Sequence, residues 1–210
     1  MTVEFIVADY LLQSNAIKLD PANPFTWASG WKSPIYCDNR ITLSYPEIRN
    51  FIRDAFVDVI ERQTGIPDVI AAVATGAIAQ GAMVADELQV PFIYIRSAPK
   101  DHGTGNLIEG RLEPGQTVVV IEDLVSTGSS SLQAVEAVRK AGGEVKALLA
   151  VFSYGFPVAE QRFREAGCPL IALSNYNALI ELATESGLID PAHLEVLKRW
   201  REDPAGWKGI

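Results

Sequence analysis

The sequence predicts an α/β fold in which a parallel sheet carries helices on both faces and a small N-terminal cap precedes it. From residue 45 onward, short apolar runs suited to strands alternate with amphipathic stretches suited to helices, over short connections. The runs at 69–74 and 117–121 are almost entirely aliphatic, as expected for strands buried on both faces. The length of 210 residues suits a single domain with its own core.

The first 15 residues read as an amphipathic helix, because apolar side chains recur at helical spacing at Val3, Ile6, Val7, Tyr10 and Leu11. Acidic residues lie among them and a basic leading segment is missing, so we do not expect a secretory signal peptide. No apolar run approaches the roughly 18 residues of a membrane span. We therefore expect a cytoplasmic protein that does not associate with membranes.

Residues 17–40 break the alternation. They are rich in proline, aromatic residues and turn pairs such as Asp20-Pro21 and Ser33-Pro34, which exclude a long helix and favour a cap of short extended pieces. The expected organisation is one structural domain with two parts. Residues 1–45 form the N-terminal helix and cap, and residues 46–210 form the α/β core with C-terminal helices.

The core elements are expected to alternate between helices and strands, apart from two successive strands at 91–95 and 117–121. The first are a helix at 47–63, a strand at 69–74, a helix at 77–88, a strand at 91–95, a strand at 117–121 and a helix at 130–141. The alternation continues through 145–152, 158–166, 170–173 and 177–186, and a last helix covers 191–201. The two strands at 91–95 and 117–121 are joined by residues 97–116. A connection of this length inside a compact domain predicts a functional lid.

Charge and cysteine content exclude several classes of protein. The chain has 18 basic and 26 acidic residues, a net charge of −8, which argues against binding nucleic acid through its backbone. Its two cysteines lie far apart in the sequence without a CxxC motif, and only two histidines accompany them. This pattern argues against a structural zinc site and against a disulfide scaffold.

The most informative stretch is residues 118–131, which read VVVIEDLVSTGSSS. A buried strand ends in Glu122 and Asp123, and a Ser/Thr/Gly turn then opens a helix. The amides of such a turn bind anions, with the turn hydroxyls as further donors, while carboxylates accept hydrogen bonds from a diol. The pattern therefore suits a sugar phosphate. A plain helix N-cap explains the Ser/Thr/Gly residues equally well, but it does not explain the acidic pair.

Other phosphate motifs are not supported. Neither Gly76 nor Gly81 precedes the Lys-Ser or Lys-Thr pair of a Walker A motif. Gly103 and Gly105 lack the third glycine of a dinucleotide fingerprint.

Three segments together resemble a known family. The acidic pair followed by Ser-Thr-Gly resembles the 5-phosphoribosyl-1-diphosphate (PRPP) motif of type I phosphoribosyltransferases. Residues 25–40, FTWASGWKSPIYCDNR, resemble the base-covering segment of orotate phosphoribosyltransferases, and residues 96–103, RSAPKDHG, resemble their mobile catalytic loop. The three segments occur in the family's order and lie far apart, so the resemblance covers most of the chain.

The resemblance implies a type I phosphoribosyltransferase-like fold with an N-terminal hood. It implies transfer of ribose 5-phosphate from PRPP to N1 of orotate, which gives orotidine 5′-monophosphate (OMP) and diphosphate in UMP biosynthesis. Mg²⁺ is the implied cofactor, held mainly by PRPP and water and not by protein ligands. The implied assembly is a homodimer in which the mobile loop at 97–116 reaches the neighbouring site.

The resemblance also assigns roles to residues. It implies catalytic roles for Lys100, His102 and Asp123. The PRPP-binding residues implied are Arg96, Lys100, His102, Glu122, Asp123, Leu124, Val125, Ser126, Thr127, Gly128, Ser129 and Ser130. Glu122 and Asp123 would hold the ribose hydroxyls, and residues 126–130 the 5′-phosphate. Ala74, Thr75 and Gly76 would form the pyrophosphate loop, while Ser126, Lys32 and Tyr36 would bind orotate.

Several positions depart from the best-known enterobacterial pattern. Ala28 and Ser97 replace lysines, Tyr154 replaces an arginine near the orotate carboxylate, and the turn at 74–77 has no lysine. We therefore expect Mg²⁺ and backbone amides of residues 72–77 to carry more of the pyrophosphate charge, and Lys32 or Arg40 to compensate near orotate. Trp27 and Trp31 are expected to anchor the cap to the core.

Two alternatives stay open at this point. A purine phosphoribosyltransferase shares the PRPP motif, although residues 25–40 argue against it. A PRPP-sensing regulator of transcription needs a basic face or a DNA-binding domain. The charge balance and the length argue against that alternative.

Overall fold

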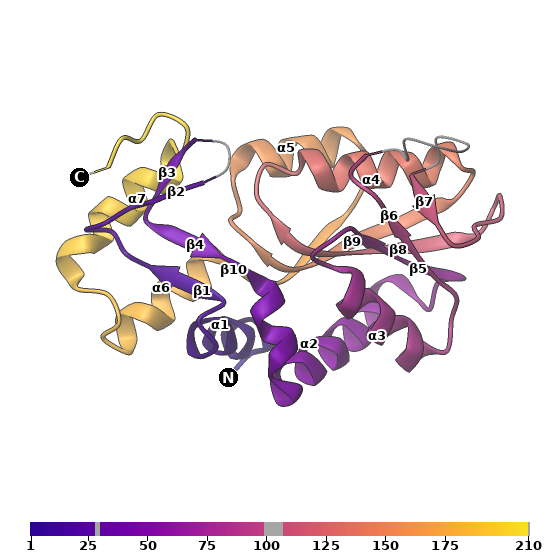
Figure 1. Cartoon of the computed structure of the whole chain (residues 1–210), viewed down its shortest axis with the longest axis horizontal. Helices are drawn as coiled ribbons and strands as arrows, with labels where there is room; N and C mark the ends of the chain where they lie inside the picture. The colour runs from indigo at the N-terminus through magenta and orange to yellow at the C-terminus, as the bar shows by residue number, and fades with distance from the viewer. Residues whose placement is uncertain (28–29, 99–106, 210) are drawn as a thin grey trace.

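A six-stranded, mostly parallel sheet forms the centre of the computed structural model, which describes residues 1–27, 30–98 and 107–209. The strand order is β10-β9-β8-β5-β6-β7 (Figure 1). The strands are β5 (Val69–Val73), β6 (Phe92–Ile95), β7 (Ile108–Glu109), β8 (Thr117–Val125), β9 (Glu144–Ser153) and β10 (Leu170–Asn175). All neighbours are parallel except β7, which runs antiparallel to β6. The predicted α/β class is confirmed.

Helices cover both faces of this sheet, and successive side chains along a strand belong to two different hydrophobic clusters. Val119 and Ile121 of β8 belong to one cluster, while Val118 and Val120 belong to the other. The first cluster includes residues of α1 (Val3–Gln13), α2 (Pro46–Val59), α3 (Ile78–Leu88), α6 (Tyr176–Glu185) and α7 (Leu194–Glu202). The second includes residues of α4 (Ser129–Lys140) and α5 (Pro157–Glu165). The period of two along each strand thus divides the core into two layers.

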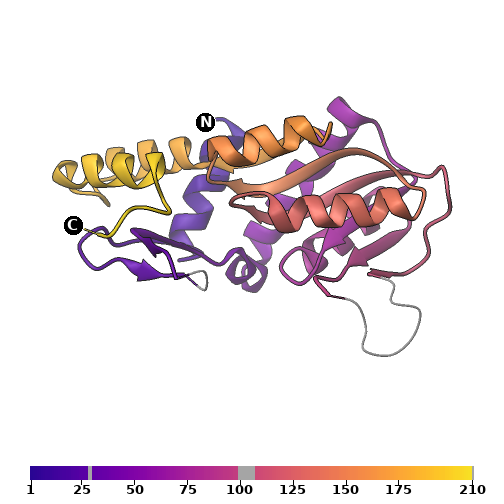
Figure 2. The same ribbon diagram turned by 90° about the horizontal axis from the view of Figure 1, so that it is seen from above.

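The cap consists of short antiparallel pairs. β1 (Ile17–Leu19) pairs with β4 (Ile35–Cys37), β2 (Phe25–Thr26) pairs with β3 (Lys32–Ser33), and a 3₁₀ helix, η1 (Asn39–Ser44), leads into the core. Figure 2 shows these strands at the same end of the molecule as the yellow C-terminal segment. Ile17 and Ile35 share the cluster that contains α1 and the sheet, so the cap is continuous with the core. The division at residues 45 and 46 stays an expectation.

The structure shifts three predicted boundaries. β8 continues to Val125, because Glu122, Leu124 and Val125 still pair with β9. α2 ends at Val59 and a π-helical turn, η2 (Ile60–Thr64), follows it. The last helix begins as a 3₁₀ turn, η3 (Pro191–His193), where the Asp190 side chain accepts a hydrogen bond from the Ala192 amide.

The predicted lid at 97–116 contains β7, whereas residues 99–106 lie outside the described ranges. Among the helices described, none combines the length and apolar character needed to cross a bilayer.

Candidate functional site

The candidate site lies where the parallel neighbours β5 and β8 end. β5 is followed by a turn at 74–77 and β8 by a turn at 126–128. Since the carboxyl ends of parallel strands share one edge of the sheet, the two turns face the same space. The predicted pyrophosphate loop and PRPP motif therefore meet.

The acidic pair occupies the last part of β8. Glu122 is buried, and its two carboxylate oxygens accept hydrogen bonds from Ser131 Oγ (2.8 Å) and from the Asp123 amide (3.0 Å). Burial, followed by the nearby Asp123 carboxylate, raises the pKa of Glu122 well above its ordinary value, although its hydrogen bond from Ser131 opposes the shift. Glu122 is thus positioned rigidly beside Asp123.

Asp123 packs against the turn that follows β5. A Cβ atom placed on Gly76 would lie 2.1 Å from Asp123 Oδ2, a distance that no side chain tolerates. Gly76 therefore permits the carboxylate and the 74–77 turn to approach each other. The amides of Thr75 and Gly76 have no acceptor within the described ranges and are available to an anion.

The turn at 126–128 forms an anion cradle at the start of α4. Gly128 adopts φ 77° and ψ 0°, the left-handed conformation that glycine allows. In the part of the chain that the structure describes, the amides of residues 126–129 have no acceptor. Together with the positive end of the helix dipole, these groups suit a phosphate.

An apolar pocket of about 220 Å³ lies next to the cradle, lined by Trp27, Tyr36, Cys37, Leu124, Ser126 and Tyr154. Burial raises the pKa of both the Tyr154 phenol and the Cys37 thiol well above their ordinary values. Both groups therefore stay protonated and neutral. The pocket suits a flat ring with a few polar atoms.

Asn39 joins this pocket to the acidic pair. Its buried side chain donates from Nδ2 to the Asp123 backbone oxygen (2.6 Å), and its Oδ1 accepts a hydrogen bond from Cys37 Sγ (3.1 Å). Sequence reasoning did not single out Asn39. Nothing local distinguishes it, because its partner lies 84 positions away.

The residues predicted to bind orotate do not all lie at the pocket. Ser126 and Tyr36 line the pocket, whereas Lys32 Nζ donates to Thr26 Oγ1 (2.8 Å) on the cap hairpin and is absent from the lining residues. Arg40, the other expected cation, pairs with Asp38 (2.6 Å). The orotate-binding roles of Ser126, Lys32 and Tyr36, and the compensating role of Lys32 or Arg40, stay predictions.

The predicted cationic residues of the lid fall at the margin of the described structure. Arg96 Nη1 lies 3.6 Å from Glu109 Oε1 of β7. Lys100 and His102 lie outside the described residues, as does Ala28 of the cap.

Trp27 anchors the cap as predicted. Its ring centroid lies 5.3 Å from that of Tyr154 and 6.4 Å from that of Trp31, and its Nε1 donates to the Ile35 carbonyl (3.1 Å). The sequence favoured packing over stacking on a base for Trp27, and these contacts show that it packs. The structure adds that the same ring is a wall of the pocket.

The side chains near the site limit how a metal ion can bind there. Within the described ranges, no three His, Cys, Asp or Glu side chains are grouped to hold a metal ion. The two Glu122 oxygens already accept hydrogen bonds, which leaves Asp123 as the nearby carboxylate. Such a set fits Mg²⁺ that arrives with a phosphate ligand, because Mg²⁺ commonly keeps waters and one or two carboxylates beside substrate phosphates.

Comparison with known proteins agrees with this geometry. The family model described as a phosphoribosyl transferase domain matches residues 43–162, which include both turns. The orotate phosphoribosyltransferase of Phocaeicola vulgatus is 58% identical over 207 residues, which cover 99% of this chain and 98% of that protein.

Two solved structures are also similar. The Leishmania donovani UMP synthase structure has a TM-score of 0.79 and 27% identity, and the match covers 94% of this chain and 42% of that one. The orotate phosphoribosyltransferase of Aeropyrum pernix has a TM-score of 0.71 at 24% identity over 88% of this chain and 99% of that one. The second match shows a shared fold.

Proposed function

Because the chain belongs to the orotate phosphoribosyltransferases, a family of the phosphoribosyltransferases, we propose that it transfers ribose 5-phosphate from PRPP to N1 of orotate. The products are OMP and diphosphate, so the reaction serves UMP biosynthesis. The position of Ser126 carries this proposal most directly. Ser126 begins the anion cradle and also lines the apolar pocket, so one short turn can contact a phosphoribosyl group and a flat base together.

The transfer exchanges one bond at the ribose C1 atom for another. The C1–O bond to diphosphate breaks and its electron pair leaves with the diphosphate. N1 of orotate gives up its proton to solvent and forms the C1–N1 bond. Positive charge develops on the sugar, where the fixed Asp123 carboxylate stabilises it. Glu122 and Asp123 accept hydrogen bonds from the ribose hydroxyls, and residues 126–130 bind the 5′-phosphate.

The leaving diphosphate needs positive partners. The acceptor-free amides of Thr75 and Gly76 support the prediction that the turn after β5 receives it. Arg96, Lys100 and His102 are proposed to close over it, from the neighbouring subunit of a homodimer. Mg²⁺ bound with PRPP would supply further charge neutralisation, consistent with the small carboxylate set at the site.

Turnover of defined substrates tests this proposal. We expect the protein to consume orotate with PRPP and Mg²⁺, with formation of OMP, and to lose that activity when a chelator removes Mg²⁺. Lys100→Ala should lower kcat by about two to three orders of magnitude, since a lid residue acts mainly on the transition state. Folded protein that consumes adenine, guanine or hypoxanthine in place of orotate would contradict the proposed acceptor. Inertness toward every base would contradict the enzyme assignment.

A further inference from the structure

Arg162 of α5 holds the turn that forms the anion cradle. Its Nη1 donates to the Thr127 carbonyl oxygen (2.9 Å) and to Ser129 Oγ (2.7 Å). These partners lie on the two sides of Gly128, so one guanidinium spans the tightest part of the turn. Sequence reasoning did not select Arg162, which looks like an ordinary surface charge of an amphipathic helix.

A second contact fixes the same turn on the same helix. A Cβ atom on Gly128 would lie 2.9 Å from the Phe163 ring, so the turn packs directly on α5. Phe163 is buried, whereas Arg162 is partly exposed. α5 therefore supports the cradle by close packing and by hydrogen bonds from a cation.

The hydrogen bonds from Arg162 also prepare the donors of the cradle. In a trans peptide the C=O and N–H groups point in opposite directions, so an Arg162 bond to Thr127 O leaves the Gly128 N–H directed away from the guanidinium. Hydrogen bonds in series polarise one another, which makes this N–H a stronger donor. Ser129 Oγ accepts from Arg162, so its own O–H stays available for donation.

We propose that Arg162 is a positioning residue for the 5′-phosphate of PRPP and OMP. It acts through the Thr127–Ser129 turn and places positive charge behind the phosphate. This inference rests on the proposed function, because it takes the ligand of the cradle to be a ribose 5-phosphate. Charge-assisted hydrogen bonds make the effect larger than that of a neutral contact.

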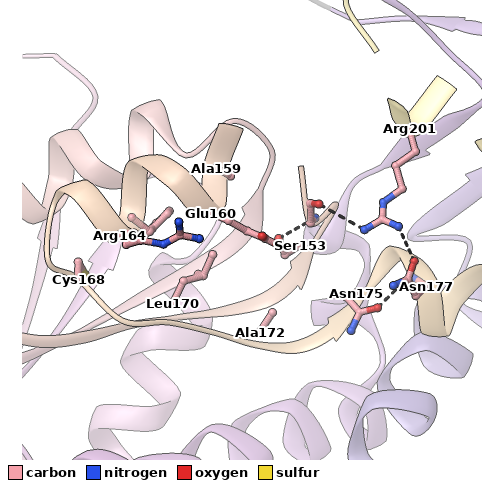
Figure 3. Close-up of a pocket in the computed structure, with 12 residues that line it drawn as sticks. Ser153, Ala159, Glu160, Arg164, Cys168, Leu170, Ala172, Asn175, Asn177 and Arg201 are labelled. Atoms are coloured by element: carbon pink, nitrogen blue, oxygen red, sulfur yellow. Dashed lines mark hydrogen bonds between the residues drawn. The ribbon is translucent and has the colours of Figure 1, made fainter. Parts of the chain in front are cut away.

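The chain offers a matched control on the same helix. Arg164 lies two residues further along α5, which places its side chain on the opposite side of the helix. Figure 3 shows Arg164 beside Glu160, Cys168 and Leu170 in a groove of about 460 Å³ between α5 and β10. Its side chain is exposed and, among the described residues, makes no hydrogen bond to the cradle, so Arg164→Met repeats the charge change without the contact.

The test compares inhibition constants of OMP and of orotidine, which lacks the 5′-phosphate, for the full-length protein and its variants. Arg162→Met should raise the inhibition constant of OMP about 10- to 100-fold and leave that of orotidine unchanged, as expected for loss of hydrogen bonds from a charged donor. The KM for PRPP should rise while kcat and the KM for orotate change little. Arg162→Lys should restore part of the loss, and Arg164→Met should behave like the parent.

Other outcomes would overturn the proposal. If Arg162→Met weakened the binding of OMP and of orotidine equally, the role of Arg162 would be general support of the fold. If Arg164→Met gave the same loss, the effect would be long-range charge alone. The parent's turnover of orotate with PRPP separates the two proposals. An active parent with an unaffected Arg162→Met variant overturns only the role of Arg162, whereas a folded but inactive parent overturns the proposed function and the phosphate role with it.

Discussion

At Glu122, the burial that positions the carboxylate for a ribose hydroxyl also disfavours its charge. The side chain is 4% exposed and lies next to a second carboxylate, and both features raise its pKa. Two hydrogen bonds hold it in place despite that cost. Local stability is thus lowered where the proposed chemistry needs an acceptor.

Glu122→Gln is therefore expected to separate stability from activity. Below the ordinary pKa of 4.5 the Glu122 side chain is protonated in the folded and unfolded chain alike, so it contributes no pH dependence there. Between 4.5 and its raised folded-state pKa the folded chain binds more protons, so the parent loses stability as pH rises through this window. Gln has no such loss. The stability of Glu122→Gln relative to the parent should rise over the window and then level off.

Urea unfolding of both proteins at a series of pH values measures this difference. The same variant should lose about 10- to 100-fold in kcat/KM for PRPP, because the Gln amide replaces one acceptor oxygen with a donor and leaves a hydrogen bond unmade. A difference in stability that is flat across the pH series would contradict the raised pKa. Unchanged kcat/KM would contradict the ribose role.

The residue scale also shows what the sequence can reveal. Glu122 and Asp123 could be predicted as site residues, because an acidic pair directly after an aliphatic run is a local pattern. Asn39 and Arg162 could not, since the residues they contact lie 84 and 35 positions away. Their types, an asparagine and an arginine, are common among surface residues.

At the scale of elements, the approach of the turn after β5 to the end of β8 sets the space available to the substrate. Gly76→Ala would force its methyl group against the Asp123 carboxylate and displace it. A displacement of about 1 Å at a reacting group can lower the rate about 100-fold, so we expect a fall in kcat of that order. Thermal unfolding should change little, because the displaced Asp123 side chain is only partly buried and lies outside the two hydrophobic clusters. Steady-state kinetics and an unfolding curve measure both effects.

Gly81→Ala is the matched control. A Cβ atom on Gly81 would lie 2.8 Å from Ala72 Cβ and 3.1 Å from the Phe92 ring, inside the core and away from the carboxylates. Overpacking of this kind costs about 1–3 kcal/mol of stability, with turnover per folded molecule preserved. If Gly76→Ala lost stability while keeping its kcat, the close approach of Gly76 to Asp123 would play no role in catalysis.

The elements themselves were largely predictable, but their ends were not. Alternating periodicity identified the helices and strands, including the buried runs of β5 and β8. It ended β8 four residues early, at Ile121, because polar residues usually end a strand. Glu122 and Leu124 stay in the ladder because β9 continues beside them as far as Ser153, a tertiary effect that a single strand does not encode.

At the scale of the whole molecule, the C-terminal helix supports the proposed base pocket. Trp200 of α7 is fully buried, with its ring centroid 5.8 Å from that of Trp27 and 5.7 Å from that of Tyr154. Both of these rings are pocket walls. A helix near the C-terminus therefore packs behind two walls of a pocket that begins in the N-terminal cap, a contact that the predicted helix at 191–201 did not reveal.

Trp200→Phe tests this long-range support. The buried indole N–H has no acceptor among the residues that the structure describes, so the substitution removes volume and ring contact but no hydrogen bond seen there. A cavity beside Trp27 and Tyr154 lets both rings shift, so we expect a higher KM for orotate. The KM for PRPP should stay unchanged, because its cradle is the turn between β8 and α4, which α5 supports. Trp200→Ala should cost about 3–5 kcal/mol of stability, as measured by urea unfolding.

Trp207→Phe is the control, because Trp207 packs on the same cluster but makes no ring contact with Trp27 or Tyr154 among the described residues. Equal KM increases for both substrates in Trp200→Phe would indicate a general loosening of the fold, whereas a change for orotate alone would show that α7 shapes the pocket through these two rings.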